Sequence, residues 1–494
     1  MTRGDLTVFI GLDLGTSGLK AVAVSGDGDV LARAQAPYPT HRPEPGASEQ
    51  DPASWRAAVR EVVAELSHGV PSRRWRAIGL SAMIPTLVTT DSTGDPVRPA
   101  ITWEDSRAEP DAQELRARIG AEDLYQVTGQ RVDGRYLLPM VVRLLRAEPD
   151  RMRHATWMLG AKDYLYWWLT GQPATDPSTA SGFGAFDLDD GGWSGRVLEA
   201  ARDLVGVLPR LPDVRAPQST VPMRPSIADS LGVSRGIGVC LGVADSVAAT
   251  VGLGTRQLGD VGYIAGTSTV ILAVADRPVR DPSQRYLLTP MASESVWGLE
   301  MDLLASGSAI RWLAGLLGCG EAELVRLAGT RDPDRGPAFL PYLAGGEQGA
   351  LWDPTLTGTL TGLGLHHDRA DLARALVSGL ILESRRCLDV LAEVTRRKGA
   401  VQLAGAGVSS ATFAQDLADA TGRAVQLPDG DVDRSALGAA RLAAGGKDPG
   451  FAGESDPRPA VVRLPVEAAR VSWDRLARRQ DETLAAFRTQ GQRL

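Results

Sequence analysis

The sequence predicts an α/β protein built from two domains of the same ancestral fold. The chain has 494 residues, which is more than one hydrophobic core usually serves. Strand-like and helix-like segments alternate along it. A strand–turn–strand unit whose turn has the sequence Gly-Thr-Ser occurs twice, with the turns at residues 15–17 and 266–268. Because equal units at a wide spacing indicate a duplicated architecture, we expect a domain boundary near residues 245–260.

The first copy of this unit opens the chain as an antiparallel meander. Residues 8–12 are apolar and predict a strand, which runs into the polar, glycine-rich turn 13–18. Residues 20–24 and 30–35 predict two more strands, and Gly26-Asp27-Gly28-Asp29 between them is a hairpin signal. The second copy repeats the pattern with strands expected on both sides of residues 266–268.

Helix signals follow the meander. Asp51 is a preferred N-cap residue and Pro52 suits the first helical position. The apolar residues at helical spacing after them are Trp55, Val59, Val62, Val63 and Leu66. Further strands are expected at 77–81 and 237–242, and a peripheral helix is expected at 471–487. Pro-, Asp- and Arg-rich stretches at 276–285, 331–337 and 446–458 read as surface loops.

Bulk properties exclude several classes of function. The net charge of −7 argues against a nucleic-acid partner, which would need a basic face. No apolar run approaches the roughly 18 residues that cross a bilayer, and the first residues lack a secretory signal pattern. The three cysteines, Cys240, Cys319 and Cys387, are far apart in the sequence. This spacing argues against a disulfide framework and fits a protein of a reducing compartment. We therefore expect a cytoplasmic protein without a membrane segment.

The two Gly-Thr-Ser turns have the composition of phosphate-binding turns. Phosphate oxygens need converging backbone N–H groups, hydroxyl donors and room to approach the main chain. The candidate phosphate ligands are Gly15, Thr16, Ser17 and Lys20 in the first turn and Gly266, Thr267 and Ser268 in the second. Neither turn is a Walker A loop or a dinucleotide turn, because the spacing differs and a strand follows. An ordinary hairpin turn is the alternative for either copy alone.

Three further places carry candidate chemistry. Asp13 ends a buried strand, where a carboxylate can hold Mg²⁺ through its hydration water. Asp245 follows the strand 237–242, where it can accept a proton from an attacking hydroxyl or simply cap the next helix. The glycine-rich turn within 401–410 can receive an adenosine or serve only tight strand–helix packing. Trp103 can stack on a sugar face or pack in the core.

These motifs, taken in order, resemble the FGGY carbohydrate kinase family, most closely its xylulokinase-like branch. The segments that carry the resemblance are the two turns, residues 48–55, 100–105, 162–165, 242–252, 340–343, 351–354, 401–410 and 436–440. The family implies two ribonuclease-H-like domains of the actin-like ATPase type with a cleft between them. Residues 1–250 would form the sugar side with the first phosphate turn, and 251–494 the nucleotide side.

The resemblance also implies roles for individual residues. Asp245 would be the general base and Asp13 the organiser of Mg²⁺, with ATP as phosphoryl donor. The nucleotide-binding residues it implies, besides the two turns, are Gly307, Ile310, Gly405, Ala406, Gly407 and Ser410. The sugar-binding residues it implies are Met83, Ile84, Pro85, Trp103, Asp105 and Asp245.

The chain departs from the family pattern in its sugar loop. Met83-Ile84-Pro85 stands where xylulokinases carry Gln-Met-His, and Gln348 and Ser378 replace an arginine and an acidic or amide side chain. Such changes can redirect a site that reads hydroxyls by hydrogen bonds. The expected activity is phosphorylation of a small sugar, a ketopentose such as D-xylulose in the first place. A kinase for another ketose, an alditol or a sugar acid, and a nucleotide-dependent sensor, stay open. Dimers are common in the family, so a homodimer is a candidate assembly.

Overall fold

The computed structural model describes residues 7–255, 257–344, 347, 349–405, 410–430, 432–445 and 459–491. The chain forms two compact units. Unit 1 comprises the described parts of Met1–Gly254, Leu288–Trp297 and Asp431–Asp456, and unit 2 those of Thr255–Leu287, Gly298–Gly430 and Pro457–Leu494. Two segments from the second half of the sequence therefore belong to the unit that contains its start.

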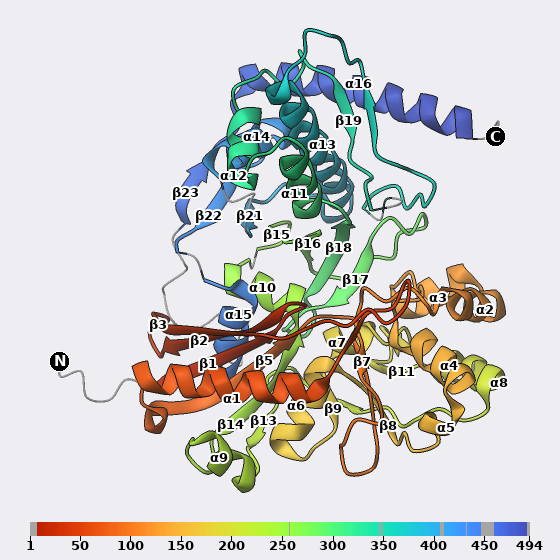
Figure 1. Cartoon of the computed structure of the whole chain (residues 1–494), viewed down its shortest axis with the longest axis vertical. Helices are drawn as coiled ribbons and strands as arrows, with labels where there is room; N and C mark the ends of the chain where they lie inside the picture. The colour runs from red at the N-terminus through yellow and green to blue at the C-terminus, as the bar shows by residue number, and fades with distance from the viewer. Residues whose placement is uncertain are drawn as a thin grey trace. The chain divides into compact units, whose positions relative to one another are not determined.

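Unit 1 is built on a six-stranded sheet in the order β13-β14-β5-β1-β2-β3 (Figure 1). Its strands are β1 (Val8–Leu14), β2 (Gly18–Ser25), β3 (Val30–Pro37), β5 (Trp75–Ala82), β13 (Thr220–Pro222) and β14 (Gly238–Ala244). The pairs β1–β2 and β2–β3 are antiparallel, which confirms the predicted meander. The pairs β1–β5 and β5–β14 are parallel, and β13 is antiparallel to β14.

A smaller four-stranded sheet, in the order β4-β7-β6-β8, lies in the same unit. Its strands are β4 (Glu49–Gln50), β6 (Leu87–Thr90), β7 (Ala100–Ile101) and β8 (Trp157–Gly160). The short pairs β10 (Phe186–Asp187) with β11 (Gly192–Trp193), and β9 (Ala174–Thr175) with β12 (Asp213–Val214), complete the strands. The helices of the unit are α1 (Pro52–Gly69), α2 (Glu109–Ile119), α3 (Ala121–Thr128), α4 (Leu137–Ala147), α5 (Pro149–Met152), α6 (Ala161–Thr170), α7 (Pro177–Ser181), α8 (Gly195–Val205), α9 (Pro225–Leu231), α10 (Asp245–Leu253) and α15 (Arg434–Ala443), with a 3₁₀ turn η1 (Ser72–Arg74).

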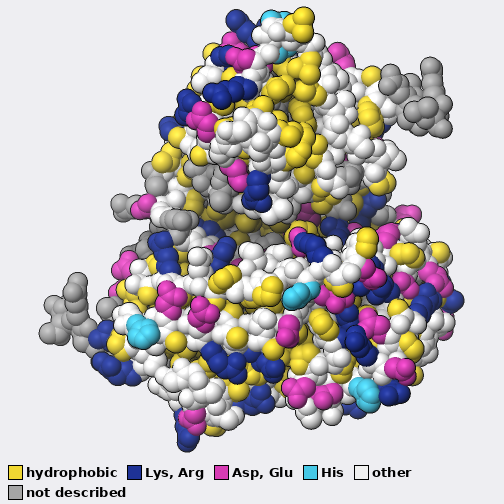
Figure 2. Space-filling model, in the orientation of Figure 1, with side chains coloured by type: hydrophobic (Ala, Val, Ile, Leu, Met, Phe, Trp, Pro, Cys, Tyr) yellow, Lys and Arg dark blue, Asp and Glu magenta, His cyan; other side chains and the backbone are white. Residues whose placement is uncertain are grey.

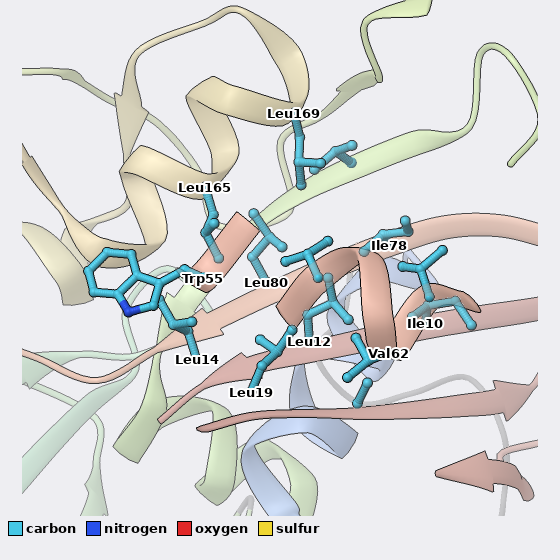
Figure 3. Close-up of a cluster of buried hydrophobic side chains, with 14 of the residues drawn as sticks. Ile10, Leu12, Leu14, Leu19, Trp55, Val62, Ile78, Leu80, Leu165 and Leu169 are labelled. Carbon is cyan, nitrogen blue, oxygen red and sulfur yellow. The ribbon is translucent and has the colours of Figure 1, made fainter. Parts of the chain in front are cut away.

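The main core of unit 1 lies between the large sheet and helices α1 and α6 (Figure 3). Asp51 caps α1 by accepting from the amide of Ala53, and Pro52 takes the first position, as the sequence predicted. The apolar stripe of α1 is buried against the strands. Figure 3 labels ten members of this cluster: Ile10, Leu12, Leu14, Leu19, Trp55, Val62, Ile78, Leu80, Leu165 and Leu169. Alternate apolar residues on β1 therefore bury one face of the strand.

Helix α15 packs against the sheet and α10 with almost no side chain between the backbones. A Cβ atom on Gly11 would lie 1.8 Å from the carbonyl oxygen of Ala436. One on Gly79 would lie 1.9 Å from the carbonyl oxygen of Ala439. Figure 1 shows α15 beside the strands of β1 and β5, although it belongs to the far end of the sequence. Glycine is therefore required at these positions because no other residue leaves room for the helix.

Unit 2 repeats the strand pairing of unit 1. Its seven-stranded sheet has the order β17-β18-β16-β15-β21-β22-β23. The strands are β15 (Val261–Ala265), β16 (Thr269–Ala275), β17 (Leu287–Pro290), β18 (Trp297–Leu303), β21 (Val401–Ala404), β22 (Val425–Pro428) and β23 (Pro459–Arg463). Residues 288–290 of β17 and Trp297 of β18 are grouped with unit 1. The pair β15–β16 is antiparallel, β15–β21 and β21–β22 are parallel, and β22–β23 is antiparallel. The same series joins β2, β1, β5, β14 and β13, which confirms the predicted duplication.

The helices of unit 2 are α11 (Gly307–Leu316), α12 (Glu321–Ala328), α13 (Arg369–Thr395), α14 (Ala411–Thr421) and α16 (Glu467–Gly491), and β19 (Ala338–Leu340) pairs with β20 (Thr359–Thr361). Within the described residues, every helix is too short or too polar to span a bilayer. Figure 2 shows acidic and basic side chains intermixed on the visible face of the chain. The stretch 446–458, expected to be a loop, lies outside the described residues.

We expect Gly79→Ala to destabilise the protein, because the added Cβ meets a backbone carbonyl that cannot rotate away. Overpacking of this kind should cost about 3 kcal/mol and lower the melting temperature by roughly 5–10 °C. Gly195→Ala is the matched control, since a Cβ there has nothing within 4 Å. Its melting temperature, measured by scanning calorimetry, should stay within roughly 2 °C of the parent. Equal melting temperatures for both variants would contradict the close packing of α15.

Candidate active site

The candidate residues of unit 1 gather at one edge of its large sheet. β1, β5 and β14 are neighbouring parallel strands, so their carboxyl ends lie at the same edge. Asp13 pairs with Ser81 in the register, and Ser81 pairs with Val243. The first turn follows β1, the loop that starts at Met83 follows β5, and Asp245 follows β14. With roughly 4.8 Å between strands, Asp13 and the end of β14 are about 10 Å apart.

The first turn is held in place through its carbonyl groups. Tyr38 donates from its hydroxyl to the carbonyl of Gly15 and from its amide to the carbonyl of Ser17, the latter at 3.4 Å. Gln50 Nε2 donates to the carbonyl of Thr16 at 2.7 Å. Among the described residues, the amides of Thr16 and Ser17 have no hydrogen-bond partner. The turn therefore offers donors on one side, while its acceptors are occupied by the protein.

Asp13 lies in an acidic environment beside this turn. Its carboxylate is buried, with 5% exposure, and accepts from Ser81 Oγ at 2.8 Å. Burial, together with the charge of Asp433, raises the pKa of Asp13 to about 7, although Ser81 and Lys20 act in the opposite direction. Asp433 is the N-cap of α15 and pairs with Lys20 Nζ at 2.9 Å. The side chain of Lys20 is half exposed, so the surrounding water weakens this ion pair.

This arrangement fits a hydrated Mg²⁺ ion. Mg²⁺ is usually held by one or two carboxylates and keeps several waters. No cluster of three or more acidic, histidine or cysteine ligands occurs in the part of the chain that the structure describes. Asp13, with Asp433 nearby, supplies the small number of carboxylates that such an ion needs. Sequence reasoning did not identify Asp433, because it precedes a helix more than 400 residues from Asp13.

Asp245 is the first residue of α10 and directly follows β14. Its side chain is half-buried, and its Oδ1 accepts from the amide of Ser246 at 2.9 Å. Its carbonyl accepts from Ser435 Oγ at 3.1 Å, so α15 also holds the backbone of this residue. A carboxylate at a helix N-terminus is stabilised by the helix dipole. The structure therefore presents Asp245 as a carboxylate at the same sheet edge as Asp13.

The loop predicted to contact sugar follows β5. Met83 is buried, while Ile84 and Pro85 are half-buried and joined by a cis peptide bond. A Cβ on Gly182 would lie 2.6 Å from Ile84 Cγ1, which places Ile84 against the end of α7. Trp103 Nε1 donates to Thr16 Oγ1 at 2.9 Å, so this indole contacts the first turn.

Asp105, another predicted sugar ligand, is tied into the protein. It is 2% exposed and accepts from the amide of Ser48 at 2.9 Å. Arg107 Nε lies 3.1 Å from both carboxylate oxygens of Asp105 and also hydrogen-bonds Glu49 through its terminal nitrogen. Burial raises the pKa of Glu49, but Arg107 and Arg98 outweigh it and hold that pKa below its ordinary value. The role of Asp105 as an acceptor for sugar hydroxyls stays a prediction.

The second turn in unit 2 is held in the same way as the first. The carbonyl of Thr267 accepts from the amides of Ser306 and Ser308, at 3.4 and 3.1 Å, and from Ser308 Oγ at 3.0 Å. The carbonyl of Ser268 accepts from the amide of Gly266 at 2.7 Å. The amides of Thr267 and Ser268 have no partner among the residues that the structure describes. Both turns therefore leave two consecutive amides unpaired.

Two other predicted nucleotide residues, Gly307 and Gly405, pack against this second turn and the strand before it. A Cβ on Gly307 would lie 2.1 Å from the carbonyl oxygen of Gly266, so the start of α11 packs directly on the turn. Gly405 has a φ of +122°, and a Cβ there would lie 1.8 Å from the carbonyl oxygen of Ala265. Ile310 is fully buried in α11. Glycine is required at both close contacts, which is typical of sites where a ligand approaches the backbone.

Ser410 begins the next helix, where its Oγ accepts from the amide of Phe413 at 3.1 Å. Ala406 and Gly407, predicted to contact the nucleotide, lie outside the described residues, as does Gln348. Ser378 is buried in α13 with an unpaired hydroxyl among the described residues.

Gln50, like Asp433, has a role in the site that the sequence did not reveal. Gln50 holds the first turn and itself accepts from Trp55 Nε1 at 2.9 Å. This pair explains the segment 48–55, which resembled the family motif without an assigned function. The only sequence signal was the position of Gln50 directly before the helix cap, and this does not indicate a contact with residue 16.

Comparison with known proteins identifies the family. The sequence profile of the N-terminal domain of the FGGY family of carbohydrate kinases matches residues 8–252, and that of its C-terminal domain matches 261–446. The chain is 31% identical over 474 residues to a xylulose kinase of Klebsiella pneumoniae, covering 95% of both chains. It is 26% identical over 472 residues to a gluconokinase of Bacillus subtilis (strain 168), covering 91% of this chain and 90% of the relative.

The fold is shared with solved members of this group. A crystal structure of a xyloylose kinase from Brucella ovis superposes with a TM-score of 0.90 at 28% identity, over 98% of this chain and 99% of the other. The chain thus has the two-domain actin-like ATPase fold, which confirms the predicted fold class. From these matches and the paired strand–turn–strand units, the chain belongs to the FGGY family of carbohydrate kinases and is an ATP-dependent sugar kinase.

Proposed function

We propose that this kinase transfers the γ-phosphoryl group of MgATP to a hydroxyl of a ketopentose such as D-xylulose, with Asp245 as general base. The observation that carries the proposal is the common design of the two turns. In each turn, carbonyl groups accept hydrogen bonds from the protein, and two adjacent amides are unpaired within the described residues. Because phosphate oxygens only accept hydrogen bonds, such turns suit a triphosphate better than a neutral ligand.

The candidate residues of the two units would have different tasks. The amides of Thr16 and Ser17, and those of Thr267 and Ser268, would bind phosphate oxygens. Asp245 would hold the attacking hydroxyl and accept its proton, while its fixed backbone keeps the carboxylate in position. A carboxylate is a weak base, so orientation and charge stabilisation should provide most of the rate enhancement.

Asp13, assisted by Asp433, would hold the magnesium ion through its hydration waters. When bound, Mg²⁺ neutralises charge that develops on the phosphate oxygens during transfer. Lys20 would remain paired with Asp433 and keep that carboxylate oriented.

The choice of a ketopentose is supported by the xylulose kinase among the relatives, which shares 31% of its residues over nearly the full length. The match to a gluconokinase favours a second candidate, a kinase for a sugar acid or another polyol. The loop at Met83 offers apolar side chains, and a sugar acid would call for a cationic one in addition. A homodimer and a cytoplasmic location are part of the proposal on the strength of the family resemblance alone.

Substrate choice can be tested with an ADP-release assay over pentuloses, hexuloses, pentitols, glycerol and gluconate. We expect D-xylulose to give the highest kcat/KM, at least about tenfold above the other compounds, since a site built for particular hydroxyls discriminates by such factors. A higher kcat/KM for gluconate would replace the ketopentose by the second candidate. Tight ATP binding with no acceptor in the panel would instead support a nucleotide-dependent sensor.

Asp245→Asn keeps the shape of the side chain and removes its basicity. We expect kcat to fall by at least about 100-fold, because general base catalysis contributes that much or more. The Kd of ATP, measured by calorimetry, should change by less than about threefold. A variant that retains near-parental kcat would show that another group accepts the proton.

Trp103→Phe tests the contact between the indole and the first turn. It removes the N–H that bonds Thr16 Oγ1 together with part of the ring system, and we expect the KM for ATP to rise about three- to tenfold. Trp75→Phe is the matched control, because Trp75 Nε1 bonds the carbonyl of Val70 at 3.0 Å at the opposite end of β5. Its KM for ATP should be unchanged. Parallel changes in both variants would mean that general stability, rather than the turn, is affected.

A further inference from the structure

A buried charged network lies directly behind Asp245. Lys162 Nζ is 3.0 Å from Asp163 Oδ1 and 3.1 Å from Asp176 Oδ1, and all of these side chains are at most 1% exposed. Burial opposes the charge on Lys162, but the two carboxylates raise its pKa above the ordinary value. The three groups are therefore joined at salt-bridge distances in a place closed to water, where burial also raises the pKa of Asp163. Neither the phosphate turns nor the proposed proton transfer uses these groups directly.

Ser178 connects this network to the residue before the proposed base. Its Oγ donates to Asp176 Oδ2 at 2.5 Å and accepts from the amide of Ala244 at 2.9 Å. Asp176 caps α7 and also accepts from the amide of Ser178 at 2.9 Å, so the serine is held at two points. The side chain of Ser178 is 1% exposed, and no water competes for these bonds.

The direction of each hydrogen bond in this chain is determined by chemistry. A backbone amide only donates, and an ionised carboxylate only accepts. The Ser178 hydroxyl must therefore point its proton at Asp176 and a lone pair at Ala244. Lys162 pairs with Asp176 at 3.1 Å and holds its carboxylate in place, which in turn keeps the serine in the orientation that accepts from the amide.

The backbone at this point needs such support. The pairing of β14 with β5 is irregular between Cys240 and Val243, and Gly242 has a φ of +74°. A Cβ on Gly242 would lie 1.7 Å from the carbonyl oxygen of Leu80. The strand is therefore irregular a few residues before Asp245, and its pairing with β5 resumes only at Val243 and Ala244. A further bond to the amide of Ala244 helps to fix the peptide that leads into Asp245.

We propose that Ser178, oriented by Asp176 and Lys162, is a positioning residue that holds the Ala244–Asp245 peptide and thereby aims the Asp245 carboxylate. Ser435 holds the other side of the same residue through its carbonyl. The inference rests on the proposed function, because it assigns Ser178 a role only if Asp245 is the base.

The test compares Ser178→Ala with Thr179→Val. Thr179 Oγ1 donates to the same carboxylate, Asp176 Oδ1, at 2.6 Å, is 5% exposed and lies on the same helix. Both variants lose a short buried hydrogen bond to Asp176, but only Ser178 also bonds the peptide before Asp245. We expect Ser178→Ala to lower kcat about 10- to 100-fold with the KM of both substrates within about threefold. Thr179→Val should lower the melting temperature by about as much as Ser178→Ala does, and its kcat should stay within about threefold of the parent.

A double variant separates positioning from general damage. If Ser178 acts through Asp245, adding Ser178→Ala to Asp245→Asn should lower the residual kcat by less than about twofold. A full further loss in the double variant, or equal kcat losses in Ser178→Ala and Thr179→Val, would overturn the inference. Unchanged kcat in Ser178→Ala with a large loss in Asp245→Asn would overturn it while leaving the proposed base intact. Unchanged kcat in Asp245→Asn would instead refute the proposed base and, with it, the inference.

Should Ser178→Ala fail to fold, Ser178→Cys fills the same space with a weaker hydrogen-bonding group. Its kcat should then lie between parent and Asp245→Asn, with parental KM values. A parental kcat in Ser178→Cys would again count against the positioning role.

Discussion

The backbone-to-backbone packing of α15 is the contact on which the geometry of unit 1 depends. Gly11 and Gly79 bring two strands against the carbonyls of this helix, and Gly438 brings it against the carbonyl of Ala248 in α10. Because side chains are absent from these contacts, the helix cannot shift along the sheet without a backbone collision. The start of α15 thereby brings Asp433 to Lys20 and Ser435 to the carbonyl of Asp245. A packing constraint thus determines where two polar side chains of the site lie.

The elements that sequence predicted correctly have local signals. The first meander has apolar strands with a glycine-rich hairpin between them, and α1 has an N-cap, a proline and a regular apolar stripe. The second turn, at residues 266–268, was recognisable because it repeats the Gly-Thr-Ser sequence of residues 15–17. The return of α15 to the first sheet has no such signal. Residues 436–440 contributed to the family resemblance, but only their contacts with distant glycines show what they pack against.

The site divides in a similar way between what the sequence predicted and what it could not. Residue types at strand ends identified the turns and the two aspartates as candidates, because chemistry restricts which groups bind phosphate or accept a proton. The neighbouring sequence does not show which residue a polar side chain will hydrogen-bond in the folded protein. The carboxylate of Asp105 is of a type that can accept from sugar hydroxyls, but both of its oxygens accept from Arg107. Gln50 looked like part of a helix start, and its contact with the Thr16 carbonyl depends on the tertiary fold.

The buried charges behind Asp245 are hard to explain as a device for stability. Burying one lysine with two aspartates costs desolvation that well-packed apolar side chains would avoid, so such a cluster gives little net stabilisation. The cluster instead fixes the orientation of its hydrogen bonds, because an ion pair in a closed environment permits few arrangements of them. The hydroxyl of Ser178 accepts from the amide of Ala244, which lies at the end of β14 just after the segment where pairing with β5 is irregular. The protein is then less stable than it would be with an apolar cluster, but the Ala244–Asp245 peptide and the carboxylate of Asp245 are held in a single orientation.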